Sequence, residues 1–373
     1  MSAIHEPDLK LGTVDEALAK GWTIPASWYA DPSVYALELE RIFGRAWTLV
    51  GPEQQLANPG DHIIAQAGHV PVVVTRDLEG ALHGFVNVCR HRAHPVALEN
   101  GNRRTLQCRY HGWTYELDGS LRSAPRCGRE FDFPLNELGL MPVAIDTWQG
   151  FVFVNPDVDA PPLREANPEL DALAAKTNLD FSEYTFRQRW TYEIPANWKV
   201  WVENATECYH CPTVHRASFS DAFDTDEDVY ELIESGNLLC QFTRYQPREG
   251  AHSDGRFAGM TGKGGFRFIY QFPTSFWAQD DYVAFTGMVV PTGTETCTFI
   301  ADVFSHPDAE EQFVQDWMEM YNQTLIEDKQ VVLAQQPGLR SNMVPYGRLL
   351  PRSESPIMHF HRLVRDALAG TTS

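Results

Sequence analysis

The stretch CRHRAHPVALENGNRRTLQCRYHGWTYELDG, residues 89–119, contains two short motifs that each pair a cysteine with a histidine. Cys89 and His91 form the first motif, and Cys108 and His111 form the second, giving the pattern C-x-H-x16-C-x2-H. Each motif lies where a loop follows a β-rich run, as the flanking turn residues indicate. The two loops therefore offer two thiolates and two imidazoles to one site.

This mixed set of ligands is what a Rieske [2Fe–2S] centre needs, because two cysteines bind one of its irons and two histidines bind the other. Neutral imidazoles in place of thiolates raise the reduction potential, which suits a one-electron relay between a reductase and a catalytic metal. A Cys2His2 zinc site is the alternative, although zinc motifs usually pair Cys with Cys and His with His. His94 falls outside the spacing and is expected beside the site or on the surface.

A second group of metal-binding residue types occurs in NWKVWVENATECYHCPTVH, residues 197–215. A helix is expected from the start of this stretch to about His210, because Pro212 disfavours its continuation. Glu207 and His210, three residues apart, would share one face of that helix. Once the helix has ended, His210 and His215 could converge as two thirds of a 2-His-1-carboxylate triad, the non-haem Fe(II) site that leaves positions open for O2 and substrate.

The third ligand is sought on the long helix that the 3.6-residue period predicts for residues 309–336. Asp328 projects from the middle of the apolar stripe of this helix, whereas Glu327 falls at the margin. A carboxylate among apolar neighbours needs a partner or a metal, so Asp328 is the predicted ligand and an ion pair with a buried arginine is the alternative. The stripe consists of Phe313, Val314, Trp317, Tyr321, Leu325, Val331 and Val332.

Composition limits the remaining possibilities. Thirty Lys and Arg against fifty Asp and Glu give a net charge of −20, which argues against nucleic acid and anionic membranes as partners. No apolar run approaches the roughly 18 residues of a membrane span, and no signal peptide is visible. The seven cysteines are therefore interpreted as reduced thiols or metal ligands in a cytoplasmic protein, with Cys208 and Cys211 as small packing thiols.

One region departs from the acidic average. Between residues 89 and 129 there are eight arginines and three acidic residues, a local balance of 8 − 3 = +5. Such a surface could steer an acidic electron donor to the cluster, or it could neutralise carboxylates of a neighbouring subunit. The arginines are Arg90, Arg92, Arg103, Arg104, Arg109, Arg122, Arg126 and Arg129.

The two groups of metal-binding residues, in this order, resemble those of the α subunits of Rieske non-haem iron oxygenases. The resemblance extends over nearly the whole chain, through CRHRAHPV, LQCRYHGWTYELDG, NWKVWVEN, ECYHCPTVH, IEDKQVVLAQQPGL and SPIMHFHRLV. It implies that the Rieske cluster is bound by Cys89, His91, Cys108 and His111. It also implies that His210, His215 and Asp328 bind the mononuclear iron.

The resemblance further implies a ring-shaped homotrimer in which Glu207 links His210 to His111 of the partner subunit. Many aromatic-ring dioxygenases have Asp at that position, and Glu is closer to members that oxidise quaternary ammonium compounds. The implied fold is α+β, with a β-sandwich Rieske domain beside a helix-grip catalytic domain. We expect a helical segment at 1–40 packed on the catalytic domain, the Rieske domain at 41–155 and the catalytic domain at 156–373.

The expected activity is that of an oxygenase component that uses O2 and electrons from NAD(P)H, delivered by a separate reductase or ferredoxin. It would hydroxylate and N-demethylate a small betaine-like substrate. Ring hydroxylation of an aromatic acid and a non-catalytic Rieske electron carrier are the alternatives. Aromatic side chains in 266–285 could form the walls of a quaternary ammonium site or belong to the core of a sheet. They are Phe266, Phe268, Tyr270, Phe272, Phe276, Trp277, Tyr282 and Phe285.

Overall fold

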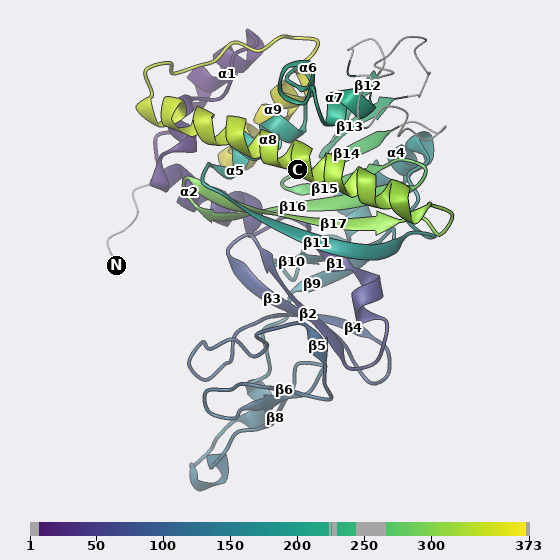
Figure 1. Cartoon of the computed structure of the whole chain (residues 1–373). Helices are drawn as coiled ribbons and strands as arrows, with labels where there is room; N and C mark the ends of the chain where they lie inside the picture. Colours follow the sequence, from purple (N-terminus) through teal and green to yellow (C-terminus); the bar gives the residue numbers. More distant parts are fainter. Residues whose placement is uncertain (1–6, 224, 226–229, 244–265, 371–373) are drawn as a thin grey trace. The chain divides into compact units, whose positions relative to one another are not determined.

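The structure is a computed structural model that describes residues 7–223, 225, 230–243 and 266–370. The chain divides into two compact units, residues 43–166 and residues 1–42 together with 167–373. Figure 1 shows strands throughout the first unit and a large sheet crossed by helices in the second. Every strand pair described is antiparallel, so the mixture of antiparallel sheet and helix confirms the α+β fold class.

Unit 43–166 contains three antiparallel sheets in the described residues. Their strand orders are β1-β10-β9, β4-β3-β2-β5 and β6-β7-β8. The strands are β1 (Thr48–Pro52), β2 (Asp61–Ala67), β3 (Val70–Arg76), β4 (Leu82–Val86), β5 (Gly101–Asn102), β6 (Leu106–Gln107), β7 (Thr114–Tyr115), β8 (Leu121–Ser123), β9 (Ala144–Trp148) and β10 (Phe151–Asn155).

Tight turns fix the register of these sheets. Gln149 and Gly150 join β9 to β10, and both have positive φ, 52° and 76°. A two-residue hairpin whose central residues both have positive φ matches the twist of the strands it connects. The pairing of Trp148 with Phe151 follows directly from this turn. Both side chains are buried.

The second unit is built on one seven-stranded antiparallel sheet with the order β11-β17-β16-β15-β14-β13-β12. Its strands are β11 (Thr185–Ile194), β12 (Tyr230–Ser235), β13 (Leu238–Thr243), β14 (Arg267–Gln271), β15 (Ser275–Gln279), β16 (Val283–Gly293) and β17 (Thr296–Ser305). The helices are α1 (Leu11–Ala19), α2 (Pro32–Glu38), α4 (Leu170–Thr177), α5 (Trp198–Ala205), α6 (Cys211–Val214), α7 (Phe219–Ala222), α8 (Glu311–Ser341) and α9 (Ser355–Ala369). A short helix, α3 (Leu163–Ala166), ends the first unit.

Helix α8 crosses one face of this sheet (Figure 1). Trp317 and Tyr321 pack on Phe285 of β16, with ring centroids 6.4 and 4.4 Å away, and burial of each such side chain contributes roughly 1.5–3 kcal/mol. The predicted apolar stripe is buried along its centre, but Val331, at its edge, is 38% exposed. The helix also continues through Pro337 to Ser341, beyond the predicted range.

Most of the aromatic residues singled out within residues 266–285 form part of this sheet. Phe268 pairs with Ala278 of β15, and Ala278 pairs with Phe285 of β16. Phe268 and Tyr270 of β14 therefore lie on the face of the sheet that carries Phe285. Tyr270 is fully buried and contacts Phe360 of α9 at a centroid distance of 6.0 Å. This aromatic face therefore packs against helices α8 and α9. Among the described residues, no helix has the length and apolar character that a membrane span requires.

Candidate functional site

Two loops with the same backbone pattern present the four candidate cluster residues in unit 43–166. The amide of Cys89 donates to the carbonyl of His94 (2.8 Å), and the amide of Ala93 donates to the carbonyl of Cys89 (3.1 Å). The second loop has the same two bonds. The amide of Cys108 donates to the carbonyl of Trp113 (2.9 Å), and the amide of Gly112 donates to the carbonyl of Cys108 (3.0 Å). The fifth residue of each loop has positive φ, 58° at Ala93 and 73° at Gly112. The two motifs thus form equivalent turns, although their spacings differ by one residue.

The side chains of these turns differ in burial. Cys89 and Cys108 are 2% and 1% exposed, whereas His91 and His111 are exposed. The two imidazole rings lie 4.5 Å apart between centroids, and His91 stacks on Trp113 at 5.0 Å. This places two sulfur donors inside and two nitrogen donors at the surface, which is the order that a cluster with one solvent-facing iron requires.

The surroundings of the cysteines fit a cluster. Cys89 and Cys108 are free thiols, and the hydroxyl of Tyr115 lies 3.3 Å from Cys89 Sγ. Burial and the neighbouring Cys108 raise the pKa of Cys89, while Tyr115 lowers it. Burial, His91 and Arg92 lower the pKa of His111, which favours the neutral imidazole that binds metals. His94, placed outside the spacing, contacts Cys108 Sγ through Nδ1 at 3.8 Å.

The second candidate site lies in the other unit, after helix α5. Asn197 caps this helix by accepting a hydrogen bond from the amide of Lys199 at 3.0 Å. The helix ends at Ala205, so the prediction that Glu207 and His210 share a helix face is wrong. Both residues lie in the following turn, where Glu207 Oε2 accepts hydrogen bonds from backbone amides, including that of His210. The carboxylate satisfies the turn, which is why the helix stops early.

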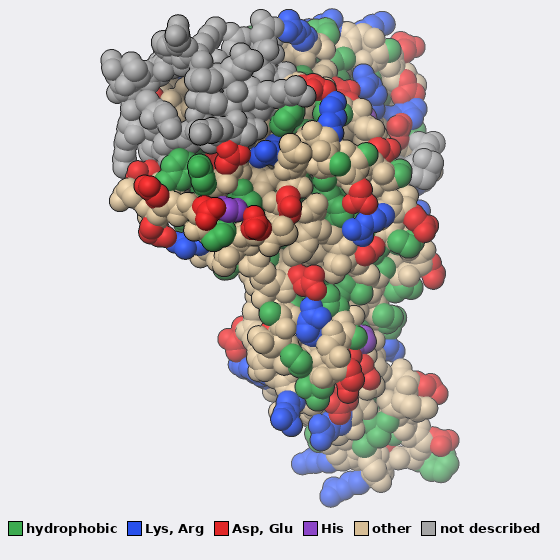
Figure 2. Space-filling model, turned by 90° about the vertical axis from the view of Figure 1, so that its right-hand side faces the viewer, with side chains coloured by type: hydrophobic (Ala, Val, Ile, Leu, Met, Phe, Trp, Pro, Cys, Tyr) green, Lys and Arg blue, Asp and Glu red, His purple; other side chains and the backbone are tan. Residues whose placement is uncertain are grey.

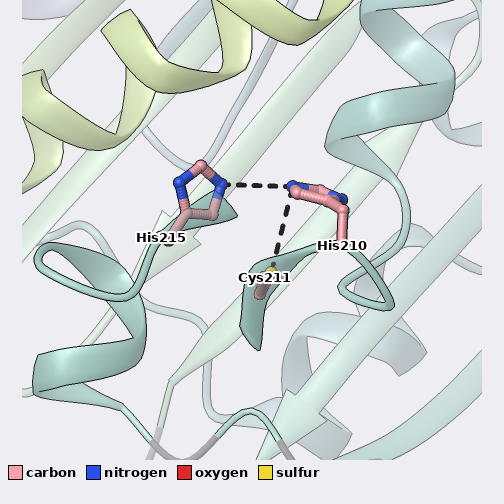
Figure 3. Close-up of side chains that lie close together, drawn as sticks. All are labelled: His210, Cys211 and His215. Carbon is pink, nitrogen blue, oxygen red and sulfur yellow. Dashed lines mark hydrogen bonds between the residues drawn. The ribbon is translucent and has the colours of Figure 1, made fainter. Parts of the chain in front are cut away.

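Three donor atoms converge at this site. His210 Nε2 and His215 Nε2 are 3.1 Å apart, and Figure 3 shows their rings pointing toward one another. Asp328 Oδ1 lies 3.3 Å from the first nitrogen and 3.0 Å from the second. Donors bound at right angles to one ion at about 2.1 Å lie about 3 Å apart. The triangle of atoms therefore has the size of one face of a metal coordination sphere.

A carboxylate holds the far nitrogen of each imidazole. Glu207 Oε1 accepts from His210 Nδ1, and Glu327 Oε2 accepts from His215 Nδ1 at 2.8 Å. Glu327 is itself held by the hydroxyl of Ser218 at 2.6 Å. When each Nδ1 carries the proton, each Nε2 presents a lone pair to the centre of the triangle.

The electrostatics of the site favour a cation. Burial alone lowers the pKa of His210, but Asp328 and Glu207 raise it to about 10. Asp328 also raises the pKa of His215 against the effect of burial. Asp328 Oδ1 is buried and has no hydrogen-bond partner among the described residues, so this carboxylate oxygen attracts a positive charge to the site. A divalent ion would satisfy all three atoms, and the residues present fit a mononuclear iron.

The interpretation of Cys208 and Cys211 as packing thiols is wrong. The structure joins them in a disulfide with Cα atoms 5.0 Å apart, so the expectation of seven reduced or metal-bound cysteines is also wrong. A C-x2-C turn brings two sulfurs within bonding reach regardless of how well they also pack. Cys211 Sγ lies 4.0 Å from His210 Nε2, farther than Asp328 Oδ1, and a disulfide sulfur carries no charge.

The helical wheel puts Glu327 at the margin of the apolar stripe and does not identify it as a site residue, because the wheel considers one helix alone. Its partner His215 lies 112 residues earlier in the chain, and no local pattern connects the two. The sequence signal that could have found it is the Glu-Asp pair at 327–328, which places a second carboxylate next to Asp328 at the margin of the same stripe.

We expect Glu327→Gln to weaken iron binding about 10- to 100-fold, because the neutral amide no longer fixes the His215 tautomer as a carboxylate does. Competition with an iron(II) chelator measures the affinity, and cluster absorbance reports an intact fold. Glu310→Gln is the matched control, since Glu310 is an exposed carboxylate at the start of the same helix. Equal iron affinity in both variants would show that Glu327 does not support His215.

Comparison with known families accounts for both sites. Residues 46–143 match the Rieske [2Fe-2S] domain, and residues 181–370 match the catalytic domain of the ring-hydroxylating α subunit. The fold and sites thus define a Rieske non-haem iron oxygenase. The chain belongs to the ring-hydroxylating oxygenase α-subunit family. It is an oxidoreductase that holds a Rieske cluster and a mononuclear iron and receives electrons from a reductase.

Individual relatives are similar over nearly the full length. The chloroplastic choline monooxygenase of Arabidopsis thaliana is 32% identical, over 94% of this chain and 84% of its own. The carnitine monooxygenase oxygenase subunit of Escherichia coli K12 is 28% identical, over 92% and 93%. A crystal structure of a quaternary ammonium Rieske monooxygenase with L-carnitine has a TM-score of 0.82 and 27% identity, covering 95% and 98%. Naphthalene 1,2-dioxygenase from Rhodococcus, with a TM-score of 0.80 and 20% identity, shares the fold.

Proposed function

We propose that the chain hydroxylates an N-methyl group of a small quaternary ammonium compound and so demethylates it. The carrying observation is the triangle of His210 Nε2, His215 Nε2 and Asp328 Oδ1 in a chain whose relatives oxidise choline and carnitine. These three residues would hold the mononuclear iron, and Cys89, His91, Cys108 and His111 would hold the cluster. The iron supplies the activation of O2, with electrons from the cluster.

The products follow from the chemistry of the hydroxylated methyl group. The quaternary amine, O2, two electrons and two protons give an N-hydroxymethyl compound and water. Its C–N bond then breaks to release formaldehyde, the demethylated amine and a proton. The described residues contribute position: Glu207 and Glu327 hold the imidazoles, and Asp328 balances charge at the centre.

An aromatic cluster beside the metal site supports a cationic substrate. Phe219 and Phe223, in and after helix α7, lie 4.6 Å apart between ring centroids, and Phe266 lies 5.5 and 5.2 Å from them. Helix α7 follows His215 by four residues, and Ser218 before it contacts Glu327. A quaternary ammonium group has no hydrogen-bond donors, so aromatic faces must bind it, at about 0.5–2 kcal/mol per contact.

Electron delivery is part of the proposal. Glu207 accepts a hydrogen bond from His210 Nδ1. In a homotrimer it would link this site to His111 of the partner subunit. Tyr209 beside it is 54% exposed, which is consistent with a surface that meets another chain. Arg103 and Arg109 of unit 43–166 are exposed, and Figure 2 shows Lys and Arg side chains on the surface of this unit. Both reach Glu99 only at 3.4 Å, so they keep charge for an acidic reductase or ferredoxin, or for a neighbouring subunit.

The proposal predicts that a betaine stimulates NAD(P)H-dependent O2 uptake and releases one formaldehyde per O2 consumed. A panel of choline, glycine betaine, carnitine and γ-butyrobetaine, assayed with a compatible reductase, identifies the substrate. The matched control for glycine betaine is 3,3-dimethylbutanoate, which has the same shape and no cationic charge. Its apparent affinity should be about tenfold weaker, since the cation–π contacts are lost. O2 uptake driven only by aromatic acids, without formaldehyde, would assign ring hydroxylation instead.

A further inference from the structure

Residues 208–211 place two cysteines around a candidate metal ligand. The Cys208–Cys211 disulfide closes a turn that contains His210, and Cys211 is the first residue of helix α6. The metal site described above uses neither sulfur. Both cysteines are buried, at 8% and 4% exposure, but Tyr209 between them is 54% exposed. The disulfide is therefore buried, next to an exposed side chain of the same turn.

The position of Cys211 relative to the two imidazoles is the second observation. Donor atoms of His210, His215 and Cys211 all lie within 4.8 Å of one another, and Figure 3 shows Cys211 on the side of His210 that faces His215. Cys211 Sγ is 4.0 Å from His210 Nε2. Sulfur and nitrogen bound tetrahedrally to one zinc ion, at about 2.3 and 2.05 Å, lie about 3.6 Å apart. The distance from Cys211 Sγ to His210 Nε2 is thus only a few tenths of an ångström longer than in such a site.

We propose that Cys211 is a latent metal ligand that the disulfide masks. The inference rests on the proposed function, since it takes His210, His215 and Asp328 as the metal site. A dithiol reductant breaks the S–S bond by giving two electrons and two protons, and becomes a disulfide itself. Cys208 and Cys211 become thiols, and the Cys211 thiol releases its proton to solvent when Zn2+ binds.

The consequence is a change in metal preference. With the disulfide closed, the site offers two nitrogens and one carboxylate oxygen, the donor set of non-haem iron(II). With the disulfide open, a soft thiolate joins them and gives four protein ligands of the kinds that zinc takes. Zinc held by four protein ligands leaves no open position for O2 or substrate. The disulfide thus protects the iron site from zinc.

Zinc K-edge X-ray absorption tests this inference, because the cluster iron does not contribute at that edge. The full-length protein, with its cluster intact and its mononuclear iron removed by a chelator, is loaded with one equivalent of zinc before and after dithiol reduction. Oxidised protein should show only nitrogen and oxygen neighbours. Reduced protein should gain one sulfur at about 2.3 Å.

Two single substitutions serve as matched variants. Cys208→Ser leaves Cys211 as a free thiol, so its zinc should have one sulfur neighbour without reduction. Cys211→Ser removes the sulfur, so its zinc should have none under either condition. Cluster absorbance shows that each variant has folded. Thiol alkylation and mass spectrometry confirm that reduction of the wild-type protein exposes both cysteines.

Three results would overturn the inference. Zinc bound without sulfur in the reduced protein and in Cys208→Ser would show that Cys211 does not reach the metal. A sulfur neighbour that persists in Cys211→Ser would assign the role to another cysteine. Failure of the oxidised protein to bind one zinc would instead contradict the assignment of His210, His215 and Asp328, which separates the two proposals.

Discussion

Asp328→Ala is expected to lower the iron content from about three to about two atoms per chain and to abolish product formation. The substitution removes the only carboxylate of the triangle, and two neutral imidazoles alone hold iron(II) weakly. The Rieske cluster lies in the other unit of the chain and should keep its EPR signal and absorbance. Metal analysis together with EPR of the reduced protein measures both quantities on one sample.

Asp316→Ala provides the matched control for this prediction. Asp316 is on the same helix, but it accepts a hydrogen bond from Gln312 at 2.9 Å and contacts none of the site residues described here. It should retain about three irons and normal turnover. Full iron and activity in Asp328→Ala would move the third ligand to another carboxylate, of which Glu327 is the nearest candidate.

At saturating iron(II), Glu207→Gln should leave the cluster reducible and the iron bound while it lowers product formation about 100-fold. Glu207 is held by backbone amides of its own turn and contacts His210 Nδ1. The amide keeps this shape and loses the charge. Because the proposed electron path passes through Glu207, the loss should fall on the step from cluster to iron. Rapid mixing of the reduced protein with O2 and substrate isolates that step.

Glu231→Gln is the control for this second prediction. Glu231 is a half-exposed carboxylate in the same unit and pairs with Lys176 at 2.5 Å, so its loss changes the net charge equally without touching the site. Normal cluster oxidation rates in Glu207→Gln would remove Glu207 from the path. A loss of iron along with activity would show that Glu207 acts by holding His210.

The parts of the molecule that depend on local sequence were predictable. The spacing of Cys89, His91, Cys108 and His111 indicated two loops, and those loops have matching hydrogen-bond patterns. Asp328 was found because a helical wheel captures burial along one helix, and its side chain does meet His210 and His215. The α+β class was implied by the resemblance to the α subunits of Rieske oxygenases, which rests on the same local motifs.

The parts that depend on tertiary contacts were not predictable. The early end of α5 follows from the hydrogen bonds that Glu207 makes in the next turn, and helical spacing does not register them. The contact of Glu327 with His215 joins distant segments. The disulfide between Cys208 and Cys211 joins residues three positions apart, and this spacing is equally compatible with reduced packing thiols, so the sequence alone does not distinguish the two states.

A single turnover of the fully reduced protein tests the central claim most directly. The chain is reduced chemically, freed of reductant, and mixed with O2 and each quaternary ammonium compound of the panel, so no reductase is needed. We predict close to one formaldehyde and one demethylated amine per active iron for at least one compound, with none from Asp328→Ala. Reoxidation of the cluster without formaldehyde from any of them, together with a hydroxylated product from an aromatic acid, would contradict the proposed function.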